Sequence, residues 1–383
     1  MTASFALYVH VPWCRHVCPY CDFNVYASSA PPEAEYTTAL VAELAAHAAA
    51  PPFAGRRART VYLGGGTPSL FSPAAVGRFL EAVARGPGVE PGAEITLEAN
   101  PGTVGRETLA AYRAAGVNRL SLGAQSFQPR LLATLGRDHA AHETRDAVEA
   151  ARAAGLANVS LDLIYAVPGE RVADCAADVE CALALAPDHV SAYALTWEPG
   201  TPFHRRRAAG RLAPVDDDDE AAMAACVAER LAAAGLARYE ISSWARPGRE
   251  SRHNTSYWDG TDYLGLGAGA HSYAADPPPG RRWRNVRPPA AWRAAVAARG
   301  TAVAAEERLT EAQARAEFCF TGLRRTVGID VAAFARRFGV PVESAFPHVA
   351  RLADDGLVER AGERLRLTAR GLLFHDSVAA TFV

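Results

Sequence analysis

The chain has 383 residues, of which 49% are hydrophobic and 21% are charged, and its formal net charge is −2. A length beyond ~100–200 residues predicts two domains, or one barrel with a small appendix. The nearly neutral charge gives no electrostatic reason to expect a nucleic-acid partner, and no apolar run is long enough to span a membrane. Because the first residues lack the charged start and cleavage site of a signal peptide, we expect a cytoplasmic protein.

A cluster of thiols follows the strand that is expected at 5–12: Cys14, Cys18 and Cys21. In a reducing compartment, clustered cysteines are more often metal ligands than disulfides. A closed zinc site would need a fourth ligand, which His10 or His16 could in principle supply. An iron–sulfur cluster of four irons held by three thiolates would instead keep one iron open for a substrate or cofactor.

A glycine-rich segment, GGGTPSL at 64–70, follows the second expected strand and a helix expected at 32–50. Glycines allow the backbone to approach a ligand closely, and Thr67 adds a hydroxyl group. A tight turn between a strand and a helix has the same composition, so this segment alone supports both interpretations. The later glycine-rich segment at 265–271 lacks the partner acid of a dinucleotide-binding unit and is expected to be a loop.

Strand-like and helix-like segments alternate through the first two thirds of the chain. The strands are expected at 5–12, 60–66, 94–101, 119–127, 159–168, 189–196 and 238–245, with further helices at 107–116 and 142–155. This alternation is typical of βαβ units and a parallel sheet. Six or seven such units predict an α/β fold with a partial (β/α)6-type TIM barrel.

The chain changes character after the Pro- and Arg-rich segment 276–289. Amphipathic helices at 330–339 and 344–358 and two short strands within 359–368 predict a small helical or winged-helix-like domain. Since no basic face is concentrated there, a lid or packing role is favoured over DNA binding. The predicted parts are a barrel at 1–245, a connecting segment at 246–300 and a C-terminal domain at 301–383.

CxxxCxYC after a first strand resembles the signature of the radical S-adenosylmethionine (SAM) superfamily. In that superfamily the three cysteines hold a 4Fe–4S cluster, the open iron chelates SAM, and reductive cleavage of SAM gives a 5′-deoxyadenosyl radical. The resemblance is closest to the HemN/HemW family and covers nearly the whole chain. It rests on YVHVPWC, CPYCDFN, VYLGGGTPSL, LEANPGT, RLSLGAQSF, LGRDH, SLDLIYAVPG and SAYALTWEPGT.

The family pattern also implies roles for single residues. It assigns Cys14, Cys18 and Cys21 to the cluster, and it places a further set on SAM or in the pocket around one or two SAM molecules: Tyr8, Tyr20, Gly65, Gly66, Thr67, Glu98, Gln125, Arg137 and Asp162. A carboxylate such as Glu98 suits ribose hydroxyls, and a guanidinium such as Arg137 suits a carboxylate. Without the resemblance, Asp162 in a strand is more often a paired structural acid with Arg137 as its surface partner.

Three features separate the branches of this family. HemN, the oxygen-independent coproporphyrinogen III oxidase, has a fourth cysteine at the position of Phe23 and a long segment before the motif, and this chain matches HemW in both respects. HNxxYW at 253–258 resembles the haem-binding signature of HemW, a haem chaperone, and imidazole ligates haem iron while aromatic rings stack on porphyrin. The candidate haem residues are His253, with His271 as a rival and Arg246, Arg249 and Arg252 as partners of the propionates.

We therefore expect a radical-SAM-type haem chaperone that binds a 4Fe–4S cluster, SAM and haem as cargo, and transfers haem to apo-haemoproteins, chiefly respiratory ones. The alternative is oxidative decarboxylation of coproporphyrinogen III, and class C methyltransferases and haem-degrading enzymes share the same barrel. A homodimer and peripheral membrane contact are further expectations from the family. A histidine in a polar loop is more often solvated, and a Tyr–Trp pair often anchors a core, so HNxxYW alone also fits a structural role.

Overall fold

The computed structural model describes residues 4–383 and is built around one curved sheet. Its centre consists of six neighbouring parallel strands: β1 (Phe5–Val11), β4 (Ala58–Gly65), β5 (Val89–Ala99), β6 (Arg119–Gln125), β7 (Val159–Tyr165) and β8 (His189–Ala194). These six strands follow one another in the sheet in sequence order. The predicted partial (β/α)6-type barrel is confirmed.

The sheet continues beyond both ends of the parallel core. Next to β1 lie β11 (Tyr263–Leu266), β12 (His271–Ala274), β13 (Arg281–Asn285) and β14 (Val303–Arg308), and next to β8 lie β10 (Ser243–Ala245) and β9 (Ala237–Glu240). β11 pairs with β1 in parallel, whereas the outer pairs are antiparallel. In the glycine-rich segment predicted as a loop at 265–271, residues 267–270 form the connection from β11 to β12, and the remaining residues end β11 and begin β12. Sheet pairing thus runs across residues 245 and 300, and the division of the chain at those positions stays a prediction.

The single strand predicted at 238–245 is wrong, because a turn at Ile241 and Ser242 divides it into β9 and β10. The backbone groups of this turn bond elsewhere. Ile241 N donates to Arg324 O at 3.1 Å, and Ser242 O accepts from Ala192 N at 2.8 Å. The turn therefore joins the sheet to the C-terminal part of the chain.

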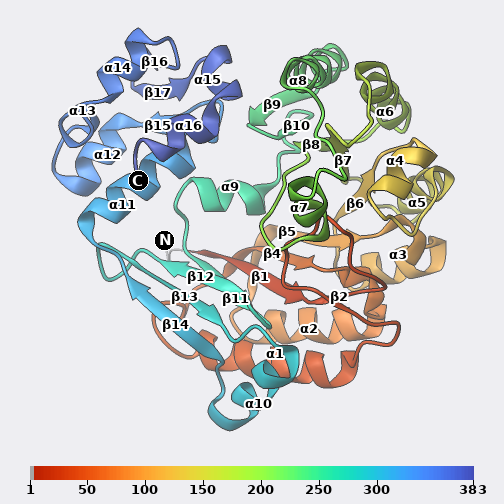
Figure 1. Ribbon diagram of the computed structural model, residues 1–383. Helices are drawn as coiled ribbons and strands as arrows, with labels where there is room; N and C mark the ends of the chain where they lie inside the picture. Colours follow the sequence, from red (N-terminus) through yellow and green to blue (C-terminus); the bar gives the residue numbers. More distant parts are fainter. Residues whose placement is uncertain (1–3) are drawn as a thin grey trace.

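Helices cover the outer face of the sheet (Figure 1). They include α1 (Glu33–Ala48), α2 (Pro73–Arg85), α3 (Arg106–Ala114), α4 (Pro129–Thr134), α5 (Ala141–Ala153), α6 (Val172–Ala184), α8 (Asp217–Ala233) and α10 (Pro289–Arg299). A shorter helix, α7 (Pro202–Ala208), instead contacts the cysteine segment, where Phe203 N donates to Pro19 O at 3.0 Å. The helices predicted at 32–50, 107–116 and 142–155 are confirmed. The start of α2 shows why such helices form: Ser72 Oγ accepts from Ala75 N at 3.2 Å, and Pro73 occupies the first helical position.

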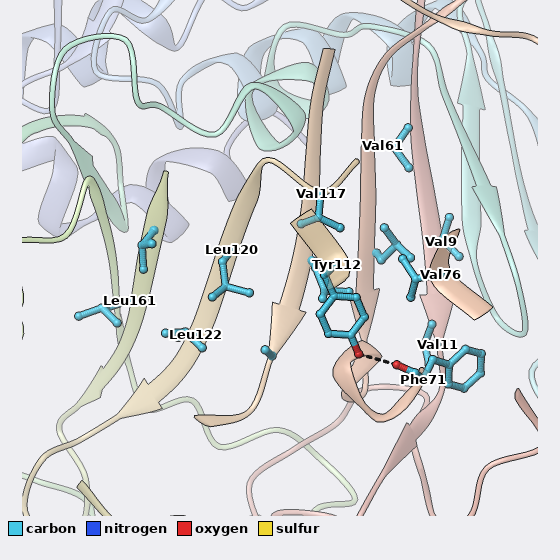
Figure 2. Packing of buried hydrophobic residues seen from close by; sticks show 14 of the residues in the cluster. Val9, Val11, Val61, Phe71, Val76, Tyr112, Val117, Leu120, Leu122 and Leu161 are labelled. Atoms are coloured by element: carbon cyan, nitrogen blue, oxygen red, sulfur yellow. Dashed lines mark hydrogen bonds between the residues drawn. The ribbon is translucent and has the colours of Figure 1, made fainter. Parts of the chain in front are cut away.

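Alternation along the strands gives the sheet an apolar outer face and a polar inner face. Figure 2 shows the outer face, where Leu120 and Leu122 of β6 pack in the same layer as Tyr112 of α3. The Tyr112 hydroxyl donates to Phe71 O at 2.5 Å and ties α3 to the start of α2. Arg119 and Ser121, which alternate with those leucines, face the interior of the barrel. The functional groups of the strands are therefore directed inward.

The C-terminal part forms a second hydrophobic core of its own. Its elements are α11 (Glu311–Gly322), β15 (Ile329–Asp330), α12 (Val331–Phe338), α13 (Val342–Ala345), α14 (Val349–Asp354), β16 (Val358–Ala361), β17 (Arg364–Leu367), α15 (Ala369–Leu373) and α16 (His375–Ala380). The three short strands pair in the order β15-β17-β16, and α12, α13 and α14 lie between β15 and β16 in the chain, in agreement with the predicted winged-helix-like shape. The single helix predicted at 344–358 is wrong, because the chain leaves the helix around Pro347 and forms α13 and α14.

No helix within residues 4–383 combines the length and the apolarity that a membrane crossing requires.

Candidate functional site

One large cavity, with a volume of about 1480 Å³, opens at the carboxyl ends of the parallel strands. Barrel enzymes place their chemistry at this end of the strands. The cavity wall combines the cysteine segment after β1, the glycine loop after β4, inward side chains of β5 to β8, part of α8 and the corner between α15 and α16. It therefore brings together segments from both ends of the chain.

The three clustered cysteines all lie on the cavity wall. Cys14 belongs to the short strand β2 (Trp13–Cys14), which pairs with β3 (Tyr26–Ala27), and a turn from Cys18 O to Cys21 N (3.1 Å) brings the other two together. Burial raises the pKa of the Cys14 thiol, and burial together with the neighbouring thiols raises that of Cys21 to about 11. Binding to a metal would reverse this effect, since coordinated thiols lose their protons.

The surroundings of these thiols fit a cluster better than a zinc ion. Among residues 4–383, no three His, Cys, Asp or Glu side chains converge tightly enough to hold one metal ion, as tetrahedral zinc requires. Both histidines that could complete a zinc site are engaged elsewhere: His10 bonds to Tyr8 Oη (3.0 Å) and Asn24 O (2.9 Å), and His16 bonds to Gly136 O. Three thiols on one short segment beside a large cavity match an iron–sulfur cluster with an open coordination position.

The glycine loop packs directly on the cysteine segment. Gly66 N donates to Val11 O (2.9 Å), and Thr67 N donates to Trp13 O (2.8 Å). A Cβ at Gly66 would lie 2.6 Å from Trp13 O, and a Cβ at Gly65, where φ is +113°, would lie 2.5 Å from the His10 ring. The Thr67 side chain in turn hydrogen-bonds to Cys14. The absence of a Cβ at these glycines thus lets the loop backbone pack closely against the segment that leads into the thiols.

Two partly buried carboxyl groups face the cavity from β5 and β7. Glu98 accepts hydrogen bonds from Tyr62 Oη (2.6 Å) and Gly65 N (3.0 Å), and burial raises its pKa to about 7. Asp162 accepts from Ser121 Oγ at 3.0 Å, and burial raises its pKa as well. A ligand that donates hydrogen bonds to these carboxyl groups would favour their ionised forms and lower both pKa values.

Arg137 and Gln125 border the same cavity. Arg137 donates to Gly123 O (3.0 Å) and to Cys18 Sγ (3.7 Å), so it is a partly buried neighbour of the thiols and not a surface partner of Asp162. Gln125 has a φ of +62°, a left-handed conformation that is uncommon for a residue with a side chain and that concentrates at functional sites.

Of the other residues that the sequence assigned to SAM, Tyr20 lies on the cavity wall and Tyr8 does not. The Tyr20 ring packs against Phe203, with centroids 6.2 Å apart. The Tyr8 hydroxyl donates to His10 Nδ1, and the Tyr8 ring stacks on Tyr62 behind the wall. The residues predicted to bind SAM therefore all border this cavity except Tyr8, which packs behind the wall against Tyr62.

His253, the candidate haem residue, is placed differently. It lies in α9 (Arg252–Trp258), which occupies the inner side of the sheet (Figure 1), and its side chain is 1% exposed. Its Nδ1 hydrogen-bonds to Thr60 Oγ1 (2.8 Å), its Nε2 hydrogen-bonds to Tyr257 Oη (2.9 Å), and its ring stacks on Tyr62. Burial lowers its pKa to about 3. In this arrangement neither ring nitrogen is free to bind a metal.

The other candidates near HNxxYW also lie away from the large cavity. Arg249 and Arg252 line a smaller cavity of about 330 Å³ at the amino ends of β5 to β7, and Arg246 donates to Pro187 O at 3.3 Å. His271 is exposed on β12. The structure does not bring this set to the thiols, whereas it places other arginines on the large cavity: Arg15, Arg119, Arg137, Arg238 and Arg324.

The apolar rim of the cavity was not predicted from the sequence. Eight large hydrophobic side chains are exposed among residues 4–383, and five of them line this cavity: Val17, Phe23, Tyr193, Leu373 and Phe374. The apolar run GLLFH at 371–375, at the end of a polar segment, was a signal that could have revealed part of this rim. Arg119 was also missed; it is buried at the cavity, and its Nε has no hydrogen-bond partner among the described residues.

Known proteins resemble this chain over its whole length. A family model described as the radical SAM superfamily matches residues 8–182, and one described as the HemN C-terminal domain matches residues 309–374. Two curated relatives are both called heme chaperone HemW. The protein of Mycobacterium tuberculosis is 40% identical over 99% of this chain and 95% of its own length, and that of Bacillus subtilis is 34% identical over 98% of each.

The solved structure of coproporphyrinogen III oxidase (HemN) from Escherichia coli, described as a radical SAM enzyme, has the same fold. It superimposes with a TM-score of 0.85 at 23% sequence identity, and the match covers 100% of this chain and 90% of that one.

Proposed function

The chain belongs to the radical SAM superfamily and, within it, to the family of the heme chaperone HemW, and from this membership we propose that it binds haem and passes it to acceptor haemoproteins. The observation that carries this proposal is the large cavity, where three thiols face an exposed apolar rim. Its volume of about 1480 Å³ exceeds the ~300–1,000 Å³ of ordinary small-molecule sites, so it has room for SAM and for a second large ligand.

In this proposal the thiolates of Cys14, Cys18 and Cys21 hold a 4Fe–4S cluster. When bound there, the cluster supplies an open iron for SAM and a source of one electron. Arg137 donates a hydrogen bond to Cys18 Sγ, and Thr67 bonds to Cys14; such bonds stabilise thiolates and tune the potential of a cluster.

The residues around the thiols are proposed to hold SAM. The backbone of Gly65 and Gly66 and the hydroxyl of Thr67 form one wall, and Glu98 accepts hydrogen bonds from the ribose hydroxyls. Other groups proposed to surround one or two SAM molecules are Tyr8, Tyr20, Gln125, Arg137 and Asp162. The support is that all of them except Tyr8 border one cavity, and that Tyr8 packs on Tyr62, which does.

The proposed acceptors are respiratory apo-haemoproteins, and the proposed location is the cytoplasm. Contact of His253 with haem, a homodimer and peripheral contact with a membrane stay predictions. For His253, contact would require α9 to release the hydrogen bonds to Thr60 and Tyr257.

Coproporphyrinogen decarboxylation is the second candidate, favoured by the fold shared with HemN. Against it stands Phe23, which is 66% exposed on the cavity wall where the sequence pattern of HemN has a cysteine. An apolar side chain there suits contact with a porphyrin better than ligation of iron.

Anaerobic assays of the protein with its cluster reconstituted test the proposal. We expect hemin to bind stoichiometrically, and coproporphyrinogen III with SAM and a strong reductant to give no protoporphyrin after oxidation of the products. A matched sample in which Cys18 is replaced by alanine controls for chemistry that does not need the cluster. Catalytic formation of protoporphyrin, or failure to bind hemin, would overturn the proposal.

A further inference from the structure

The corner between α15 and α16 exposes apolar side chains toward the cavity. Phe374 joins the two short helices, and it and Leu373 border the cavity while remaining 48% and 62% exposed. Exposed apolar surface costs about 25 cal/mol per Å² relative to buried surface. Exposed apolar side chains that gather at one cavity typically mark a binding site for a ligand or a partner.

A histidine next to these side chains has the features of a metal ligand. His375 borders the cavity, is only 8% exposed, and lies 3.0 Å through Nδ1 from Asp376 Oδ1. Donation of the Nδ1 hydrogen to this carboxylate makes Nε2 the nitrogen with the lone pair. A carboxylate that fixes the tautomer in this way is the usual partner of metal-ligating histidines.

The Nε2 of His375 is buried and has no hydrogen-bond partner among the described residues. Three other histidines within residues 4–383 have one such nitrogen: His47, His139 and His348. None of those three borders the cavity. Burial and the nearby Arg324 lower the pKa of His375, which keeps the imidazole neutral and able to coordinate.

Other segments contribute further exposed apolar side chains to the same cavity. Val17 and Phe23 of the cysteine segment and Tyr193 of β8 are also exposed there, so apolar side chains stand on segments far apart in the sequence. Arg15 and Arg324 border the same space and can face carboxylates. A planar apolar ligand with a central metal and acidic side chains matches this combination.

We propose that His375 is an axial ligand of the iron of haem, and that Leu373 and Phe374 cover the porphyrin against the cysteine segment. This inference rests on the proposed function and names the site at which the cargo binds. Because Nε2 is covered by the chain itself, the corner must shift as haem enters, and helices of five and six residues lose little intrinsic stability by moving.

Hemin titration of the reconstituted protein tests the assignment with a spectroscopic readout. We expect the ferrous wild-type complex to show an iron–histidine stretching band in resonance Raman spectra. The His375→Ala variant should lose this band and bind hemin at least tenfold more weakly, and added imidazole should restore the ligation. His348→Ala is the matched control, because His348 lies in the same domain and also has an unpartnered Nε2.

A second pair of variants tests the apolar cover without touching a histidine. Leu373→Asp should weaken hemin binding at least tenfold, whereas Val327→Asp, at a side chain that is 48% exposed but outside the cavity, should leave it unchanged. The far-UV circular dichroism of every variant checks its folding, and this second pair decides the matter if His375→Ala does not fold.

The results separate this inference from the function on which it rests. If the wild-type protein does not bind hemin, the proposed function fails. If it binds hemin and the iron–histidine band persists in His375→Ala, or if Leu373→Asp binds like the wild type, the site assignment is wrong while the chaperone function stands. Loss of the band in His253→Ala alone would assign the ligand to α9 instead.

Discussion

Replacing Gly66 by alanine tests how tightly the glycine loop is packed on the cysteine segment. The new Cβ would lie 2.6 Å from Trp13 O and 2.9 Å from the carbonyl carbon of Trp13, and these backbone atoms cannot rotate away. The loop must therefore move outward, which disrupts the hydrogen bonds from Gly66 N to Val11 O and from Thr67 N to Trp13 O. At about 1 kcal/mol for each bond, the free energy of unfolding should fall by about 2 kcal/mol.

The same displacement should weaken SAM binding, because it carries Thr67 away from Cys14 and shifts the wall proposed for SAM. Loss of one hydrogen bond to SAM, about 1 kcal/mol of binding free energy, corresponds to a rise of about fivefold in the dissociation constant. Urea unfolding of the chain and equilibrium dialysis of SAM against the reconstituted protein measure the two effects.

Gly77→Ala is the matched control for this experiment. Gly77 lies within α2, and its added Cβ would make an ordinary contact of 3.5 Å with Ala115 Cβ. Since alanine favours a helix over glycine by up to about 1 kcal/mol, the control should be slightly more stable than the wild type and bind SAM equally well. If Gly66→Ala matched this control in both stability and affinity, the packing account would be refuted.

Three further predictions follow from buried groups. Burial raises the pKa of Glu98 to about 7, so SAM binding should weaken as the pH falls from 8 to 6 and the carboxylate gains a proton. Glu98→Gln should bind SAM weakly and with a smaller pH dependence. If equilibrium dialysis gave the same pH dependence of SAM binding for both proteins, the role of the carboxylate would be contradicted. Glu43 is buried, bonds to Gly267 N, Asn285 Nδ2 and Trp292 Nε1, and has a pKa raised to about 7. Its proton stays on the folded chain after the unfolded chain has lost it, so stability should fall by up to about 3 kcal/mol between pH ~4.5 and ~7. Urea unfolding of Glu43→Gln should lack this part of the slope, and an unchanged slope would exclude Glu43 as its source. Tyr112→Phe should cost about 1 kcal/mol through loss of the hydrogen bond to Phe71 O (Figure 2), and an unchanged urea midpoint would show that this bond adds nothing.

The barrel and the cofactor end of the site could be predicted because local patterns determine them. Strands with apolar cores alternate with helices, so the order of β1 to β8 follows from the sequence. The thiols and the glycine loop follow consecutive strands, and the carboxyl ends of parallel strands meet at one edge of the sheet. The resemblance then supplied roles for Glu98 and Asp162 that composition alone could not.

The placement of His253 could not be predicted, because it depends on contacts between distant segments. Thr60 and Tyr62 face inward from β4, and α9, almost 200 positions later, brings His253 against them. The histidine of the polar HNxxYW segment is therefore buried, whereas Asn254 of the same segment borders the large cavity. The corner with Phe374 and His375 was missed for the same reason, since only the docking of the C-terminal domain brings it to the cavity that the cysteine segment also borders.

The most direct test of the central claim is transfer of haem from the loaded protein to a respiratory apo-haemoprotein, followed by the change in the Soret spectrum of the acceptor. A large excess of an unrelated apo-haemoprotein as a haem trap measures spontaneous release in parallel. We predict that haem reaches the respiratory acceptor faster than it is released to the trap. Transfer no faster than release would contradict the account and would leave a haem-binding protein that does not deliver its cargo.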